Sequence, residues 1–289
     1  MFDNFNLIPG EAFGAIDNIS NNLINKIADA TGYILTPHGK RKDEEEAINY
    51  FIEEIKKNDK MPLYLKMASI SEARRLLKRY RNQRDIFLES MKYLNDNATP
   101  ELIDDDWLVN FTEKAGSISN KDVQAIYAKM LSEEAIKPGT ASKNLINVIA
   151  VMDNESANAF RELIKCMIFL EDDNGEEEPS VIYPINHKEE YNKNLRFTDF
   201  VNLSSLGLLE YSAGLSGGYA WENTELKARY GDKHFILKSN KGNSIMSGNV
   251  NLTRSGKELA KILTPEIEYE YLDRMKDFWK KRNVDIIER

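Results

Sequence analysis

The chain contains one cysteine and three histidines in 289 residues, which limits the chemistry it can support. Cys166 has no second cysteine to pair with, and its position in the mostly apolar stretch 163–168 predicts a helix that buries the thiol. His38, His187 and His234 are far apart and have none of the spacings that zinc sites use. We therefore expect no internal disulfide and no metal held by His and Cys.

Long apolar runs are also missing. No stretch approaches the roughly 20 consecutive apolar residues that a membrane-spanning helix needs. The start, Met1-Phe2-Asp3-Asn4, lacks the basic residues and apolar stretch of a secretory signal. We expect a cytoplasmic protein.

Most of the known catalytic motifs are absent as well. The sequence has no phosphate-binding Gly-x-x-x-x-Gly-Lys loop, no dinucleotide-binding glycine pattern and no His-Glu-x-x-His, and its one match to Gly-x-Ser-x-Gly is the segment 214–218. The glycine-rich segment 214–218 has no strand-to-helix context, which favours a turn. We predict no catalytic, cofactor-binding or metal-binding residue and no cofactor. A metal-dependent nuclease built from the many carboxylates is the third hypothesis for function.

The charges that are present are unevenly distributed. Residues 1–190 contain 23 Lys and Arg against 34 Asp and Glu, whereas residues 191–289 contain 16 against 13. The acidic part should repel nucleic acid, and the C-terminal third need not.

The first amphipathic pattern runs from Pro9 to Ala30, where apolar residues recur every three or four positions. The residues of this stripe are Phe13, Ile16, Ile19, Leu23 and Ile27. A stripe of this kind packs in the core or against a partner helix, so we interpret it as an assembly or packing helix. Adsorption to a membrane surface is the alternative, and it is disfavoured because Lys26 is the only basic residue of the stretch.

A long amphipathic helix is predicted from about Leu63 to Asn95, and it has a basic stretch. The basic residues are Arg74, Arg75, Lys78, Arg79, Arg81 and Arg84. They form either a nucleic-acid patch or a solvated face that pairs with the acidic helix between Asp43 and Glu54. We favour the second interpretation because the surrounding half of the chain is acidic.

The central block from Asp104 to Leu170 is predicted to form capped helices joined by short turns. Asp104-Asp105-Asp106 suggests either a cation site or a helix start, and the unsatisfied N–H groups of a helix start favour the latter. Ser119 and Asp153 are expected to begin two further helices, the second continuing through Met167. The acidic segment 171–180 then predicts a flexible linker between a helical domain, residues 1–170, and a second domain, residues 181–289.

The C-terminal domain has a different pattern, with expected strands as well as helices. A short helix from Phe197 to Leu206 is followed by expected strands at 208–211, 225–238 and 243–252, and Thr253 and Pro265 open two last helices. This order resembles the closing part of a winged-helix module. The basic residues on the proposed hairpin that are placed to meet phosphates are Lys227, Arg229, Lys233, Lys238 and Lys241. The predicted fold is mainly α, with an N-terminal helical bundle followed by a smaller α+β, winged-helix-like domain.

Several ordered motifs carry a family resemblance. They are Arg81-Asn82-Gln83-Arg84, Asp106-Trp107, Ser119 with Gln124, and Pro138-Gly139 with Ser142. On these motifs the region from about Gly32 to Leu170 resembles the bacterial Domain of Unknown Function 2806 family. This chain has Tyr127-Ala128 and Ser132-Glu133 where the family tends to have Trp-Ala and Gly-Glu. The resemblance implies kinship and fold but no activity and no catalytic residue.

Three functions follow as hypotheses. The first is a non-enzymatic interaction or scaffold protein that forms a homo-oligomer or binds a partner protein, in bacterial stress response or phage defence, without peripheral membrane contact. The second is nucleic-acid binding through the C-terminal module, although the helix that would read the groove has only Arg196 at its edge and Asp199 within it. The nuclease is the third.

Overall fold

The computed structural model describes residues 18–33, 41–172, 174–183, 194–211, 217–220, 225–239, 244–263 and 265–289. The chain divides into two compact units, Met1–Ile146 and Asn147–Arg289. The first boundary predicted from the sequence, at residue 170, is therefore too late, because the helix and strand that precede residue 170 pack with the C-terminal unit. Among the described residues, no helix is both long and apolar enough to cross a bilayer.

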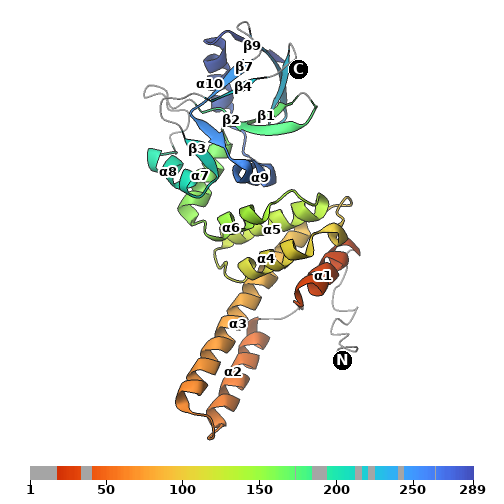
Figure 1. Cartoon of the computed structure of the whole chain (residues 1–289), viewed down its shortest axis with the longest axis vertical. Helices are drawn as coiled ribbons and strands as arrows, with labels where there is room; N and C mark the ends of the chain where they lie inside the picture. The colour runs from red at the N-terminus through yellow and green to blue at the C-terminus, as the bar shows by residue number, and fades with distance from the viewer. Residues whose placement is uncertain are drawn as a thin grey trace. The chain divides into compact units, whose positions relative to one another are not determined.

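The N-terminal unit is built from helices (Figure 1). Its helices are α1 (Asn18–Thr31), α2 (Arg41–Lys57), α3 (Leu63–Ser90), the short η1 (Met91–Tyr93) and η2 (Pro100–Leu102), α4 (Asp105–Ala115), α5 (Lys121–Ile136) and the first half of α6 (Lys143–Ala150). The predicted N-terminal helical bundle is confirmed.

Aromatic side chains fill the centre of this unit. Phe111 of α4 stacks on Trp107 and contacts Tyr127 of α5, and Phe87 of α3 also stacks on Phe111. All four rings are nearly or fully buried. The Trp107 indole donates to the main-chain oxygen of Ala141 at 2.7 Å, so the ring also holds the turn before α6. The core therefore joins the C-terminal third of α3 to α4 and α5.

Side-chain caps set the helix starts. The Asp104 carboxylate accepts from the Trp107 N–H, and this bond keeps the pKa of Asp104 below its usual value. Asn120 caps α5, whereas the sequence suggested Ser119. The predicted cap Asp153 is confirmed, since its carboxylate accepts from the Ser156 N–H. The capping interpretation of the acidic triplet at 104–106 is thus confirmed for Asp104.

The C-terminal unit combines helices with sheets. Its helices are α7 (Asn154–Ile164), α8 (Phe197–Ser205), α9 (Arg254–Ile262) and α10 (Tyr269–Lys280). Its strands are β1 (Met167–Glu171), β2 (Glu177–Val181), β3 (Leu209–Tyr211), β4 (Gly217–Ala220), β5 (Leu226–Tyr230), β6 (Lys233–Ser239), β7 (Ser244–Gly248), β8 (Val250–Leu252) and β9 (Val284–Glu288). The prediction of an α+β unit is confirmed at this level of detail.

The main sheet has five antiparallel strands in the order β2-β1-β5-β6-β9. Two further two-stranded pairs are β3 with β8 and β4 with β7. One face of the main sheet is apolar and buried, as at Leu170, Tyr230 and Leu237. The other face contains both charged residues of β5, Lys227 and Arg229.

The predicted linker at 171–180 is wrong. This segment is the turn and second strand of the β1–β2 hairpin, in which Met167 pairs with Val181 and Glu171 with Glu177. The Asp172 carboxylate accepts from the N–H groups of Asn174 and Glu176, which stabilises the turn. An acidic side chain therefore stabilises the hairpin turn, because its oxygens accept hydrogen bonds from main-chain N–H groups of the turn.

The helix predicted through Cys166 is also shorter than expected. α7 ends at Ile164, Cys166 lies in the turn that follows, and Met167 begins β1. Cys166 is fully buried, as predicted, and burial raises the pKa of its thiol well above the usual range. An unreactive core thiol fits this environment.

Buried tyrosines connect the helices and sheets of this unit. The Tyr271 hydroxyl of α10 donates to the main-chain oxygen of Cys166 at 2.8 Å and lies 3.0 Å from that of Ile182. The Tyr230 hydroxyl donates to Lys165 O and accepts from the Glu268 N–H, and burial raises its pKa to about 12. These bonds position α10 against the β1–β2 hairpin.

Candidate functional site

The predicted assembly stripe is mostly an internal surface. Leu23 and Ile27 are buried where α1 packs on α4 and η2, and Ile19 is half-buried. Phe13 and Ile16 lie outside the described residues. The burial of Leu23 and Ile27 agrees with the packing interpretation of the stripe, and its assembly role stays a prediction.

The predicted nucleic-acid residues lie on the main sheet, and most of them are engaged with carboxylates. Arg229 forms a two-pronged ion pair with Glu177, and its guanidinium lies 4.3 Å from the centre of the Phe169 ring. Lys227 pairs with Glu171, and Lys238 with Glu225. Lys233, at the start of β6, has no ion-pair partner in the described part of the chain, and Lys241 lies outside it.

Lys227 and Arg229 line a shallow hollow of about 370 Å³ on the sheet face, together with their partners Glu171 and Glu177. Its lining includes Phe169, Arg229, His234 and Ile236. The Arg229 guanidinium bonds to both Glu177 oxygens and to Gly231 O, so it has little capacity left for a phosphate. The ion pair also lowers the pKa of Glu177, as expected for a stable pair. The hollow is therefore lined by ion pairs that stabilise the sheet.

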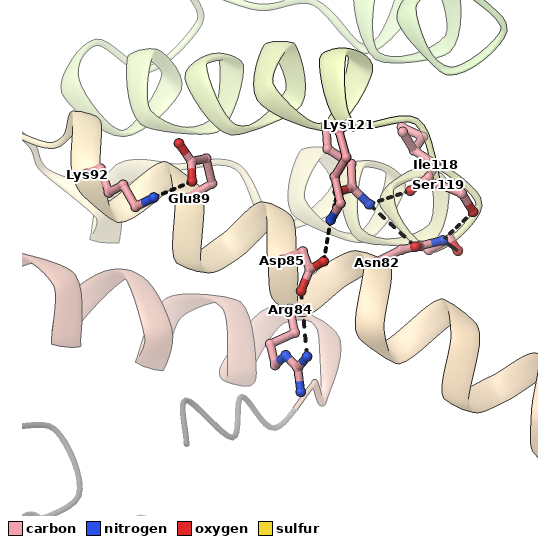
Figure 2. Close-up of polar contacts among 10 residues, drawn as sticks. Asn82, Arg84, Asp85, Glu89, Lys92, Ile118, Ser119 and Lys121 are labelled. Carbon is pink, nitrogen blue, oxygen red and sulfur yellow. Dashed lines mark hydrogen bonds and ion pairs between the residues drawn. The ribbon is translucent and has the colours of Figure 1, made fainter. Parts of the chain in front are cut away.

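A second polar cluster joins α3 to α5 (Figure 2). The Lys121 ammonium lies 2.6 Å from Asp85, which Arg84 approaches from the other side at 3.6 Å. Lys92 pairs with Glu89 and lowers the pKa of that carboxyl. These ion pairs lie within one helix or between neighbouring helices. The lowered pKa of Glu89 shows that its carboxylate is stabilised by the pair with Lys92. In the part of the chain with assigned positions, no three His, Cys, Asp or Glu side chains are grouped to hold a metal ion.

The residues that carry the family resemblance stabilise the loops between helices. Asn82 donates to Gly116 O and to the Ser119 hydroxyl, and Gln124 donates to Ile118 O. In Figure 2 Asn82 reaches from α3 toward Ser119 in the turn before α5. Gln83 donates to Thr112 O in the same region. These motif residues therefore hold the turn between α4 and α5, which is a structural role.

The part of the N-terminal unit that lacks covering contacts is the hairpin of α2 and α3. Figure 1 shows α2 beside the N-terminal half of α3, with both extending away from α1, α4 and α5. The buried residues of α3 all lie between Asn82 and Ser90, and no side chain from Leu63 to Arg81 is buried. In α2, only Ile52 and Ile55 are buried among its described side chains. The hairpin is thus a two-helix projection.

Local interactions form the hairpin turn. The Asn58 side chain accepts from the Lys60 N–H, and Asn58 O accepts from the Met61 N–H. Pro62 precedes the first turn of α3 with an extended ψ, which suits its lack of an N–H. The Lys66 ammonium donates to Lys56 O across the hairpin at 2.8 Å. The two helices are therefore joined in a fixed antiparallel pair.

Large apolar side chains are concentrated on this projection. Seven of them are between 42 and 85% exposed. We call this set the hairpin surface: Tyr50, Phe51, Leu63, Tyr64, Leu65, Met67 and Leu76. When exposed apolar side chains are concentrated on one part of a folded protein, that part is more often a contact site for a partner than a surface that stays in water. The hairpin surface is the candidate functional site.

The sequence contains one signal for this surface. The prediction of an amphipathic helix from Leu63 to Asn95 did not use that signal. Leu63, Tyr64 and Leu65 are consecutive at the start of that helix. Consecutive residues are about 100° apart around a helix, so three of them cannot all lie on one buried face. At least one had to be exposed, and in the structure all three are.

Comparison with protein families places the chain in a family of unknown function. The family model described as "Protein of unknown function (DUF2806)" matches residues 70–276. The match starts inside α3 and runs into α10, so it covers more of the C-terminal unit than the resemblance suggested and excludes the tip of the hairpin. No curated protein and no solved structure matches the chain.

Proposed function

This chain belongs to the family of proteins of unknown function DUF2806, and we propose that it is a non-enzymatic interaction protein that contacts another polypeptide through the hairpin surface. The observation that supports the proposal is the set of seven exposed apolar side chains on a two-helix projection. Bacterial stress response or phage defence is the setting in which we propose that it acts.

The energetics favour a contact of this kind. Burying one Leu, Met or Phe side chain contributes roughly 1.5–3 kcal/mol. Leu63, Leu65, Met67 and the neighbouring aromatic residues can therefore offset the cost of association when a partner covers them together. The antiparallel hairpin is already formed, so little order has to be gained on binding.

Site-specific photo-crosslinking in cells of the native host tests the proposal. Tyr64 is replaced by benzoylphenylalanine, and Leu102, which is also open to solvent but lies on η2, is replaced in a matched control. We expect a crosslink to a polypeptide from position 64 and none from position 102. Equal crosslinking from both positions, or none from position 64 in the folded chain, contradicts the proposal.

The alternative function is nucleic-acid binding through a winged-helix-like module. Its support is that β3 follows α8, that β8 precedes α9, and that β3 and β8 pair with each other. The carboxylate partners of Lys227, Arg229 and Lys238 argue against it. Measuring duplex and single-strand binding at low salt tests this alternative, because phosphate contacts weaken steeply as salt rises.

A further inference from the structure

We infer that the partner of the hairpin surface is a second copy of this chain, with the two hairpins side by side and α2 of each copy against α3 of the other. The inference rests on the proposed function and adds the identity of the partner. Helical spacing, charge and symmetry support it independently.

Helical spacing places apolar residues from both helices on one flank of the hairpin. Ile52 of α2 is buried and Leu77 of α3 is half-buried, in two helices that pack on each other, so both face the other helix. Phe51 and Leu76 each precede one of these residues by one position. Each is therefore rotated by about 100° in the same sense around its own helix. In an antiparallel pair, equal rotations lead to the same flank.

The flank extends along the hairpin. Leu65 precedes Lys66, whose ammonium reaches across to Lys56 O, and Leu65 is eleven residues, or about three helical turns, from Leu76. Ala47 is one turn from Phe51 in α2 and is also exposed. The two helices thus share an apolar flank that consists of Ala47, Phe51, Leu65 and Leu76. A four-helix bundle buries such a flank between two pairs of helices, and here only one pair is present.

The charges of the two helices are opposite. The segment Asp43–Glu54 contains six acidic residues and no basic residue, whereas Leu63–Arg84 contains seven basic residues and one acidic residue. The ion pairs of Glu53, Glu54 and Glu72 stay within their own helices, with Lys56, Lys57 and Arg75. In the described ranges, exposed Glu45, Arg74 and Lys78 have no ion-pair partner.

This arrangement is self-complementary. When two hairpins are related by a twofold axis, the acidic α2 of one copy lies beside the basic α3 of the other, and the same contact occurs twice. Exposed charges of opposite sign then surround a buried apolar centre, as in stable protein interfaces. An anionic lipid surface fits less well, because the acidic residues of α2 lie beside the same apolar flank.

The test measures the mass of the full chain by light scattering at micromolar concentrations. We expect the mass of two chains for the parent and of one chain for the double variant Leu65→Asp, Leu76→Asp. Both positions are exposed, so the variant should keep the helix content of the parent in circular dichroism. Leu102→Asp, on another surface, is the matched control and should remain a dimer. A monomeric parent overturns the inference, and so does a double variant that stays dimeric.

Charge reversal then tests which helices meet. Glu45→Lys with Glu46→Lys, and separately Arg74→Glu with Lys78→Glu, should each weaken self-association by about tenfold or more through like-charge contacts. Mixing the two variants should restore a heterodimer, a result that a purely structural role for these residues would not give. Failure of the mixture to associate overturns the proposed pairing of α2 with α3.

The outcomes separate this inference from the proposed function. If the purified chain is monomeric while Tyr64 crosslinks to a different protein, the second copy is excluded and the interaction function stands. If the monomeric chain instead sediments with phosphatidylglycerol vesicles through Leu65, the inference is overturned in favour of a lipid surface. If position 64 crosslinks to nothing, the proposed function fails as well.

Discussion

The indole N–H of Trp107 donates a hydrogen bond to the main-chain oxygen of Ala141 across 34 residues of sequence. Trp107 lies on α4 in the aromatic core, and Ala141 lies in the turn before α6. One side chain thus joins the apolar core to a buried position in a loop.

Replacement of Trp107 by Phe keeps an aromatic ring but removes this donor. We expect the free energy of unfolding to fall by about 1–3 kcal/mol, because the buried Ala141 oxygen loses its partner. Urea unfolding of the full chain, followed by circular dichroism, measures the change. Val109→Ala on the exposed side of α4 is the control, and a Trp107→Phe variant as stable as the parent would exclude a contribution from the bond.

Glu134 is a buried carboxylate that organises the next turn. Its two oxygens accept from the N–H groups of Gly139 and Ala141 at 2.6 and 2.9 Å. Glu134→Gln leaves one oxygen for two donors, so we expect a loss of about 1–3 kcal/mol in a denaturant titration. Glu133→Gln is the matched control, because burial already raises the pKa of Glu133 and disfavours its charge. Equal effects at both positions would contradict this role.

Gly256 lies where α9 passes close to the chain after α8. A Cβ at this position would lie 1.9 Å from the main-chain oxygen of Leu208, which is closer than atoms can approach. We expect Gly256→Ala to destabilise the C-terminal unit by about 1–3 kcal/mol, because backbone has to move. Hydrogen exchange of the amides of β3 and α9 measures this effect. Lys261→Ala on the exposed face of α9 should leave exchange unchanged.

The Asp153 cap predicts a dependence of stability on pH. The hydrogen bond from the Ser156 N–H lowers the pKa of Asp153 in the folded state. Its stabilising contribution is therefore complete above the unfolded value of about 4 and is lost as the pH falls through the lower folded value. Thermal unfolding between neutral and acidic pH measures this loss. Asp153→Asn keeps the acceptor and should flatten the acidic part of the profile, whereas Asp153→Ala should cost about 1 kcal/mol at neutral pH. An unchanged acidic profile for the Asn variant would contradict the assignment.

Arg229 should matter for stability more than for nucleic-acid binding. Because its guanidinium is engaged by Glu177 and packs on Phe169, we expect Arg229→Ala to lower the melting temperature and to leave duplex affinity unchanged in fluorescence anisotropy at low salt. Lys233→Ala is the control on the neighbouring strand. A clear loss of affinity for Arg229→Ala alone would favour the nucleic-acid alternative.

Local chemistry explains what could be predicted. Asp104, Asp153 and Thr253 each cap the helix that the sequence suggested, because a side-chain oxygen can satisfy an N–H only two or three residues away. Strand β1 was missed for a non-local reason. Met167–Glu171 is a strand because β2 and β5 pair with it on either side, and a short apolar run has no periodicity that separates a strand from a helix.

The sequence by itself determined the caps of α4, α7 and α9 and the opposite charges of α2 and α3. Only the tertiary structure decided which apolar stripe is free for a partner. Leu23 and Ile27 on α1 are buried by α4 and η2, whereas Leu65 and Leu76 on α3 are exposed, although both pairs belong to amphipathic helices. The reason is physical: a helix pattern encodes an apolar face, but distant segments of the chain determine whether anything covers it.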